Sequence, residues 1–351
     1  MNRDNDHSAA LCQQVKAAHD AASPLKISAG NSKDFYGRKV EGTPLSLREH
    51  SGILDYHASE LVITARSGTR ISELETALAE NQQMLAFEPP CHTPDSTLGG
   101  SVACGLSGPR RATAGAARDF VLGVHVINGR GEALKFGGQV MKNVAGYDVS
   151  RLMVGAQGTL GVLLDISVKV LPKPEREITL CFEHDFEQAR QHVHQWILQG
   201  HPISASCHDN GQLLIRLSST ENSLLNARQK LGGEQLDLDI WHQLRHQTHP
   251  FFSAHPKLWR VSVPPATPLF AENCPQLMEW NGALRWIASE EDMFAEARKH
   301  GGHATRYTLN SEPADQVFQP LATPLLAIQK KLKASFDPHH IFNRGRLYPD
   351  L

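Results

Sequence analysis

Apolar positions in the first part of the chain follow helical spacing in two places and strand spacing in several others. Leu11 and Val15 predict a helix that Ser8 caps and that ends before a Ser-Pro pair. Ser72 and Glu75 have the spacing of a capping box, which predicts the start of a second helix. Short apolar or alternating runs predict strands at 25–27, 53–56, 61–65, 84–87, 120–127 and 132–136. This order indicates a βαβ scaffold.

The pattern changes after residue 174. Asp185 can cap a helix with one apolar face, and Asp209-Asn210-Gly211 is a strong hairpin signal. The predicted elements are strands 177–182, 203–207 and 213–217, helix 223–231, strands 258–263 and 284–287, helix 291–300 and strand 303–307. They form a β-α-β-β-α block and a second, less regular copy. A helix from Pro324 to Asp337 follows. We therefore predict domains at 1–174 and 175–310, with residues 311–351 returning to the first domain.

Three glycines lie within seven residues where a predicted helix passes into a predicted strand. Gly155, Gly158 and Gly161 follow the helical pattern of residues 147–154 and precede alternating apolar residues at 166–170. Glycine lets a ligand approach the main chain, at an entropic cost that an ordinary connection does not require. The order of helix, G-x-x-G-x-x-G and strand differs from the strand, G-x-G-x-x-G and helix of a Rossmann site. We expect a bound cofactor, but not at a Rossmann-type nicotinamide site.

Two further loops of small residues are candidate anion sites. The loop from Ser28 to Lys33 leaves a predicted strand, so consecutive amides can face an anion while Lys33 adds positive charge. Gly99 and Gly100 lie at a predicted helix start, where exposed amides and the helix dipole favour phosphate. Ordinary turns and tight helix packing use the same residue types. Both interpretations stay open from the residues alone.

Composition places the chain among ordinary globular proteins. A net charge of −2 gives no electrostatic reason to expect nucleic acid or an anionic membrane as partner. No apolar run is long enough to span a bilayer, and the start of the chain lacks a signal-peptide core, so we expect a cytoplasmic protein without an integral membrane segment. The six cysteines contain no C-x-x-C pair, which argues against an iron–sulfur site on this chain. His242 and His246 lack the H-E-x-x-H pattern, so a solvated helix face is favoured and no metal is expected.

These motifs resemble the PCMH-type FAD-binding family, to which vanillyl-alcohol oxidase belongs. The resemblance rests on GYD at 146–148, GTLG at 158–161, LP at 171–172, TLGG at 97–100, and a C-terminal DP followed by IFNRG at 341–345. It implies an α+β protein with a two-subdomain FAD-binding fold and an α+β, ferredoxin-like cap domain.

The resemblance also implies where FAD binds. The loop after the first strand and the TLGG loop would hold the pyrophosphate, the segment around residue 118 would approach the flavin ring, and Asn343 would lie near the flavin. Lys142 is a candidate to stabilise charge on the cofactor, or a surface lysine. Because the first loop holds no histidine, FAD is expected to be non-covalent. The predicted cofactor-binding residues are Ser28, Gly30, Asn31, Ser32, Lys33, Asp95, Ser96, Thr97, Gly99, Gly100, Arg118, Asp119, Gly155, Gly158, Gly161, Val162 and Asn343.

From end to end the chain is similar to the FAD-binding subunits of bacterial glycolate oxidases (glycolate dehydrogenases). The similarity includes MKNVAGYD at 141–148, WNGALRW at 280–286 and GGHATR at 301–306. It implies a complex with a homologous FAD-containing catalytic subunit and an iron–sulfur subunit. That complex would oxidise a small 2-hydroxy acid, glycolate, to glyoxylate. Any peripheral contact with the inner membrane would run through the partners.

The chain lacks the H-x-G-D-G-N-x-H cluster of the homologous catalytic subunits. We therefore predict that it carries FAD and electrons while a sister subunit performs most of the oxidation. His303 is the best candidate base in this chain, and Arg285 or Arg306 the candidate ligand of a substrate carboxylate. A structural role is the alternative for each. Two other functions stay open: a self-sufficient FAD-dependent D-2-hydroxy-acid (D-lactate) dehydrogenase, and a structural subunit without flavin.

Overall fold

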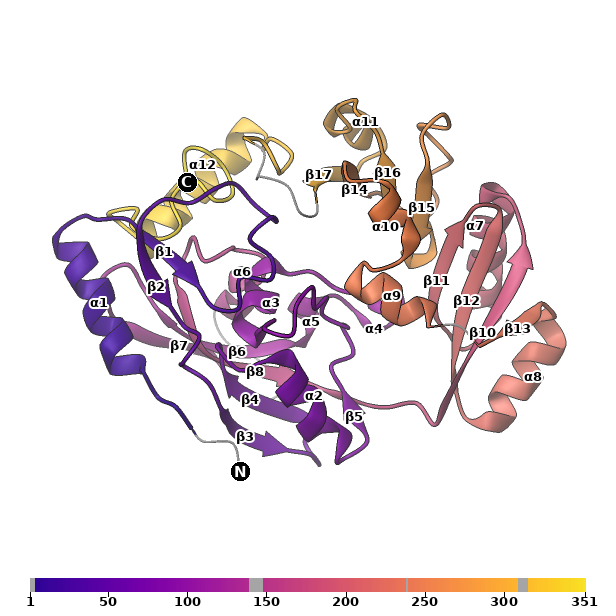
Figure 1. Ribbon diagram of the computed structural model, residues 1–351, viewed down its shortest axis with the longest axis horizontal. Helices are drawn as coiled ribbons and strands as arrows, with labels where there is room; N and C mark the ends of the chain where they lie inside the picture. The colour runs from indigo at the N-terminus through magenta and orange to yellow at the C-terminus, as the bar shows by residue number, and fades with distance from the viewer. Residues whose placement is uncertain (1–3, 139–147, 238, 309–314) are drawn as a thin grey trace.

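A computed structural model describes residues 4–138, 148–237, 239–308 and 315–351. Lys142 and the first two residues of the GYD motif lie outside these ranges. The described chain forms a first domain and a cap beside it, and its C-terminal helix packs back against the first domain (Figure 1). No helix in these ranges has the length and apolar character needed to cross a bilayer.

The first domain is built around a five-stranded sheet. Its helices and strands are α1 (Ser8–Asp20), β1 (Leu25–Ser28), β2 (Thr43–Ser46), β3 (Ile53–His57), β4 (Val62–Arg66), α2 (Ile71–Ala79), β5 (Gln83–Met84), α3 (Leu98–Cys104), α4 (Arg111–Ala114), α5 (Ala117–Phe120), β6 (Val121–Ile127), β7 (Ala133–Gly137), α6 (Val149–Met153), β8 (Val162–Lys169) and β9 (Leu171–Pro172). In the described residues the antiparallel sheet has the order β3-β4-β8-β6-β7. Leu74 of α2 and Val102 of α3 share its main core with Ile63 and Ile166.

A smaller layer completes the first domain. β1 and β2 pair in parallel, and α1 packs with them. Leu11 and Val15 of α1 share a core with Leu45, Val162 and Phe342, so this layer joins the start of the chain, the main sheet and the C-terminal segment. Burial of such apolar side chains contributes about 1.5–3 kcal/mol each. The layer places the loop after β1 against the glycine-rich turn before β8.

The cap is one antiparallel sheet made of two similar units. Its elements are β10 (Arg176–Glu183), α7 (Phe186–Leu198), β11 (Ile203–Asp209), β12 (Gln212–Ser219), α8 (Glu221–Leu231), β13 (Glu234–Leu236), α9 (Ile240–His246), α10 (Pro250–Ala254), β14 (Leu258–Ser262), β15 (Gln276–Glu279), η1 (Trp280–Gly282), β16 (Leu284–Ala288), α11 (Phe294–Lys299) and β17 (His303–Tyr307). Within the described chain the strand order is β13-β10-β12-β11-β15-β16-β14-β17. Each half therefore has the ferredoxin-like order fourth, first, third, second. The predicted second copy is confirmed as a repeat of this topology.

The two faces of the cap sheet have different neighbours. Helices α7, α8 and α11 cover one face, here called the outer face, where Trp259 and Ile287 pack on Phe294 of α11. The other face, here called the inner face, packs Leu258 and Trp286 together with first-domain residues such as Tyr36. The side chains of a strand alternate between these two environments. Every second residue of a cap strand therefore faces the first domain, and the residues between them face the covering helices.

Local capping and strand signals were the least accurate predictions. Helix α2 begins at Ile71 without a side-chain cap, so the predicted capping box is wrong. Glu75 instead pairs with Arg245 of the cap, a tertiary ion pair that outweighs the local motif. Ser8 is the first residue of α1 rather than its cap, and its amide donates to Asp6 Oδ1 at 2.8 Å. Of the predicted strand at 84–87 only Met84 is in a strand, because β5 consists of Gln83 and Met84, which pair with β9.

Helix α12 (Thr323–Phe336) attaches the C-terminal segment through a buried lysine. Lys333 Nζ donates to the carbonyl oxygens of Thr159 and Phe342 at 2.7 and 2.8 Å, and to Asp337 Oδ2 at 2.7 Å. Asp337 also accepts from the amides of Ile341 and Phe342. Both charged groups are therefore buried, paired and hydrogen-bonded, which is the condition under which a buried ion pair is tolerated.

Replacing Lys333 with methionine is expected to lower the free energy of unfolding by about 3–5 kcal/mol, because Asp337 would remain buried without its cation. Lys331→Met on the exposed side of the same helix is the control, with an expected change within about 0.5 kcal/mol. Equilibrium unfolding in urea measures both. Similar values for the two variants would contradict the structural role of Lys333.

Candidate functional site

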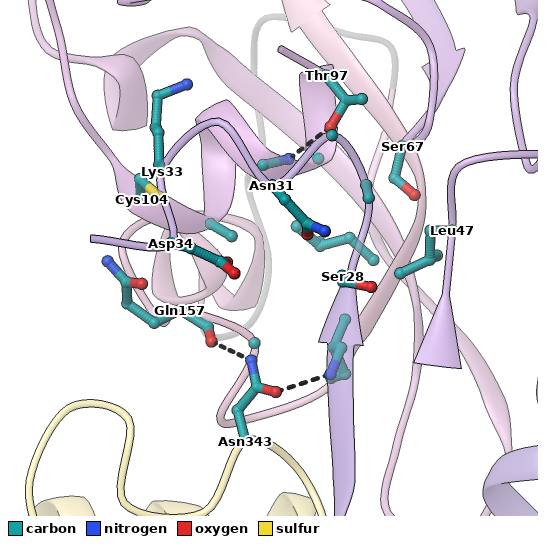
Figure 2. A pocket seen from close by; sticks show the side chains of 18 of the residues that line it. Ser28, Asn31, Lys33, Asp34, Leu47, Ser67, Thr97, Cys104, Gln157 and Asn343 are labelled. Carbon is teal, nitrogen blue, oxygen red and sulfur yellow. Dashed lines mark hydrogen bonds between the residues drawn. The ribbon is translucent and has the colours of Figure 1, made fainter. Parts of the chain in front are cut away.

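An open cavity lies in the first domain between three segments that are distant in sequence. The loop after β1, helix α3 and the turn before β8 line it, and Asn343 lies at one side (Figure 2). Arg346 also lines the cavity. The predicted cofactor residues found on its wall are Ser28, Gly30, Asn31, Ser32, Lys33, Thr97, Gly99, Gly100, Gly158, Gly161 and Asn343. The cavity therefore brings together the three predicted glycine-rich segments.

The loop after β1 carries five consecutive amides without a protein acceptor. In the described part of the chain, no hydrogen bond is formed by the amides of residues 29–33. Asn31 has a left-handed backbone with φ 53°, which curves the main chain as in anion-binding nests. A Cβ on Gly30 would lie 1.6 Å from the Asp95 carbonyl oxygen, so this position accepts only glycine. The loop is thus built to offer main-chain donors to a ligand in the cavity.

Two side chains from the C-terminal segment hold this loop in place. Asn343 accepts a hydrogen bond from the Ile27 amide at 2.8 Å through Oδ1 and donates to the Gln157 carbonyl oxygen at 2.7 Å through Nδ2 (Figure 2). Arg346 donates to the carbonyl oxygens of Asp34 and Tyr36 at 3.1 and 3.2 Å. These contacts occupy carbonyl groups around the loop and leave its amides free.

Lys33 adds a buried positive charge beside the free amides. The residue is 6% exposed, and within the described chain its Nζ has no hydrogen-bond partner. Burial lowers the pKa of Lys33, and the charge of Arg245 adds to this effect. Figure 2 shows its side chain extending from the loop on the side away from Asn343. A buried ammonium without a partner is costly, so a negative ligand would be favoured here.

The amides of the second predicted phosphate loop have acceptors within the protein. The amides of Leu98, Gly99 and Gly100 donate to the Thr69 carbonyl at 2.9 Å, the Ser67 carbonyl at 2.8 Å and Thr97 Oγ1 at 3.2 Å. The prediction that these amides are exposed is therefore wrong. Gly99 instead permits close packing, since a Cβ there would lie 2.6 Å from the Ser67 Cβ. The segment still forms a wall of the cavity.

Asp95 and Ser96 lie behind the loop rather than on the cavity wall. Asp95 pairs with Arg48 and Arg70 at 2.7 and 2.9 Å. Ser96 Oγ donates to Ser32 Oγ at 2.9 Å. In this structure Ser96 therefore contacts the loop through Ser32, and Asp95 pairs with two arginines outside it. Their predicted contact with FAD stays a prediction.

Four other predicted residues lie away from the cavity. Arg118 and Gly155 line a separate hollow beside α6 and α12. Asp119 accepts a hydrogen bond from the Ala116 amide at 2.8 Å at the start of α5. Val162 is fully buried in β8, where it pairs with Ile127. The structure does not bring these residues to the lysine and amides of the loop.

The candidate catalytic residues are divided between the two faces of the cap. His303 lies on the inner face of β17. Partial burial lowers its pKa, and the charges of Arg260 and Arg111 lower it further. Arg285 is buried on the outer side, where each of its nitrogens donates to a carbonyl oxygen, among them Pro268 O at 2.7 Å. Arg306 stacks on Trp259 on the same side, with its Cζ 5.0 Å from the ring centroid. The two arginines are therefore not placed beside His303.

Sequence reasoning missed several residues of the cavity wall. Val40, Leu47 and Leu163 contribute apolar surface, and Ser67, Cys104, Gln157 and Arg346 contribute polar atoms. Gln157 lies inside the G-x-x-G-x-x-G motif and Arg346 follows Asn343 by three residues, so proximity to predicted site residues was the available signal for these two. No motif spacing marked the others. The described residues contain no group of three or more His, Cys, Asp or Glu side chains placed to hold a metal.

The fold and the site define a FAD-binding protein of the PCMH type. Residues 6–137 match the family model of an FAD binding domain. Among solved structures, p-cresol methylhydroxylase with bound substrate superimposes with a TM-score of 0.73 at 14% identity, covering 98% of this chain and 87% of that one. Alkyldihydroxyacetonephosphate synthase gives a TM-score of 0.66 at 16% identity, covering 98% and 76%. At these identities the similarity concerns the fold.

Sequence comparison identifies the family more narrowly. Glycolate oxidase subunit GlcE of Escherichia coli is 47% identical over 354 residues, which cover 100% of both chains. Glycolate oxidase subunit GlcD of Bacillus subtilis is 35% identical over 140 residues, 40% of this chain and 29% of that one. The chain belongs to the GlcE family of glycolate oxidase subunits.

FAD, the cofactor that this family implies, fits the donors of the cavity. Its diphosphate supplies the anionic oxygens for which the amides of residues 29–33 and the Lys33 ammonium have no partner in the described chain. The glycine positions leave room for close approach of a ligand to the main chain. The loop would hold the diphosphate, and Asn343 and Arg346 would keep the loop in its binding conformation.

A methyl group at Gly30 should disrupt the site. Gly30→Ala is expected to cost about 1–3 kcal/mol in unfolding free energy, because the Asp95 carbonyl must move, and to weaken FAD binding about tenfold or more. Gly100→Ala is the control, since a Cβ there meets only Thr97 Oγ1, at 3.2 Å. Its stability should change by less than about 1 kcal/mol. Urea unfolding and a fluorescence titration with FAD measure both effects, and an unchanged affinity in Gly30→Ala would contradict the assigned site.

Proposed function

We propose that this chain is the FAD-carrying subunit of a complex that oxidises glycolate to glyoxylate and passes the electrons to an iron–sulfur subunit. The observation that carries the proposal is the loop of residues 29–33, whose amides lack acceptors within the described chain, next to the buried, unpartnered Lys33. The substrate is inferred from the full-length relative, which is named a glycolate oxidase subunit. We infer that the complex works in the cytoplasm, with any membrane contact made by its partners.

The chain's own residues have defined tasks in this function. Bound FAD supplies the acceptor for the hydride that leaves the hydroxyl-bearing carbon of the substrate. The free amides and Lys33 fix the diphosphate, while Asn343 and Arg346 hold the loop. The loop of residues 28–33 contains no histidine, which supports non-covalent attachment. Fixing the cofactor by its diphosphate sets the position of its reactive ring without a covalent bond.

We place most of the substrate chemistry on a homologous FAD-containing sister subunit. The present sequence lacks the H-x-G-D-G-N-x-H cluster, and the HGGHATR segment at 300–306 that holds its candidate base His303 contains neither the Asp nor the Asn of that cluster. His303 remains our candidate base if this chain reacts with substrate itself. GlcD is named as another glycolate oxidase subunit and is similar to this chain over 140 residues. We propose that the sister subunit is a protein of the GlcD kind.

The proposal is tested with the purified chain and with the assembled complex. The pure chain should show the absorption of bound FAD, and acid precipitation should release the pigment into the supernatant. Glycolate-dependent dye reduction should require the complex and should be lost when this chain is omitted. A colourless chain would overturn the proposal, and glycolate oxidation by the chain alone would transfer the catalytic role to it.

The affinity for FAD should depend on pH through Lys33. Lys33→Met should weaken FAD binding by about 10- to 100-fold, because a charge-assisted contact is lost. Wild-type affinity should fall as pH rises through the pKa of Lys33, which burial lowers from its ordinary value, since only the ammonium attracts the diphosphate. Lys26→Met on the same cavity wall, whose exposed amine lies 3.7 Å from Asp34, should change affinity less than about threefold. A titration across alkaline pH in which Lys33→Met follows the wild-type curve would exclude this role.

A further inference from the structure

Two arginines from different domains meet on one tryptophan at the domain interface. Arg111 of α4 places its Cζ 4.4 Å from the centroid of Trp280, and Arg260 of β14 places its Cζ 4.9 Å from the same ring. Trp280 is 2% exposed, and its Nε1 donates to the Gly108 carbonyl oxygen at 3.0 Å. The ring is therefore a fixed platform that joins the cap to the first domain and carries both guanidinium groups.

The strand register places further functional groups around this platform. Arg260 pairs with Trp286 on β16 and with Thr305 on β17, and paired residues project from the same face of a sheet. Ser262 pairs with His303 one step further along the same face. The motifs WNGALRW and GGHATR thus supply Trp280, Trp286, His303 and Thr305 to one inner-face cluster. Its partner from the first domain is Arg111.

The positive charge of this cluster is not neutralised by an ion pair. In the described ranges, neither the Arg111 guanidinium nor that of Arg260 has a carboxylate or hydrogen-bond partner, and their contacts are those with the tryptophan rings. Burial lowers the pKa of Arg111 and the charge of Arg260 lowers it further, while Asp119 acts on Arg111 only through space. Glu279 is the nearby inner-face carboxyl, and its Oε1 accepts from Trp286 Nε1 at 2.8 Å. Burial raises the pKa of Glu279 to about 7, which reduces its value as a counter-charge.

We propose that Arg111 and Arg260 form a carboxylate-binding site between the two domains, and that its ligand is a small 2-hydroxy or 2-oxo acid. Guanidinium groups bind carboxylates through paired, charge-assisted hydrogen bonds, and stacking on Trp280 fixes their planes beforehand. His303 lies on the same face and can contact the hydroxyl or oxo group next to the carboxylate. The choice of ligand rests on the proposed function. The chain would then bind the acid itself, in addition to carrying FAD.

Calorimetric titration of the full-length, FAD-loaded chain with oxalate tests this site. Oxalate is a carboxylate of the size of glycolate that cannot be oxidised in the same way, and a chloride-free buffer avoids a competing anion. We expect one site, at least about tenfold weaker in Arg111→Gln and in Arg260→Gln. Arg260→Lys, which keeps the charge but not the fork, should bind at an intermediate level. The uncharged analogue glycolamide should not bind.

Two further variants separate the site from general effects of charge. Arg228→Gln on the exposed surface of α8 should bind oxalate like the wild type. Arg306→Gln tests the arginine on the outer face of β17, and loss of binding there but not in Arg260→Gln would overturn the proposal. Far-ultraviolet circular dichroism checks folding, and Arg111 provides a second, independent variant if Arg260→Gln does not fold. Wild-type affinity in both Arg111→Gln and Arg260→Gln would also overturn it.

Failure of this inference is distinguishable from failure of the proposed function. A chain that holds FAD and supports glycolate oxidation in the complex, yet does not bind oxalate, would exclude the carboxylate site alone. A chain that binds oxalate but is dispensable for glycolate oxidation would retain the site and exclude the proposed function.

Discussion

The cofactor site depends on the hydrogen bonds that the Asn343 amide makes with two segments far away in sequence. One joins it to β1 at Ile27, the other to the turn before β8 at Gln157, and both groups of the amide are used. Without Asn343, the half-buried Ile27 amide and the buried Gln157 carbonyl would lose their partners, and the buried group alone would cost about 1–3 kcal/mol. Arg346 extends the constraint to the carbonyl groups that follow the loop. The free amides of the loop are a consequence of this arrangement, because the groups that could have folded the loop onto itself are held elsewhere.

The sequence was most informative where a periodic pattern coincided with a buried surface. The alternation at 303–307 and 258–263 predicted β17 and β14, and the glycines at 158 and 161 predicted a turn that reaches the cavity. It was least informative where one residue type serves several purposes. Glu75 has the spacing of a helix cap but pairs with Arg245, 170 residues later. The small residues at 97–100 suggested exposed amides, yet the neighbouring strand connection at Ser67 and Thr69 accepts their hydrogen bonds.

The arginines of the cap illustrate the same limit. Arg285 and Arg306 lie in the distinctive motifs and were chosen for that reason, but their strand parity turns them away from the first domain. Arg260 stands in an ordinary apolar strand and was passed over, although it faces the interface. Such a distinction requires the register of four strands and the position of the cap relative to the first domain. A single sequence gives neither the strand register nor the position of the cap. For this reason only part of the cavity wall was predicted, and of the interface cluster only the motifs that contain some of its residues.

The order in which the chain is made also matters for the cofactor. Ile27 must wait for Asn343, 316 residues downstream, before its amide can be bonded as in the final structure. At ordinary synthesis speeds this interval lasts roughly 15–60 s. Until then β1 lacks the hydrogen bond that holds it next to the FAD loop in the final structure. The complete frame of the cofactor loop can therefore form only after Asn343 has been synthesised.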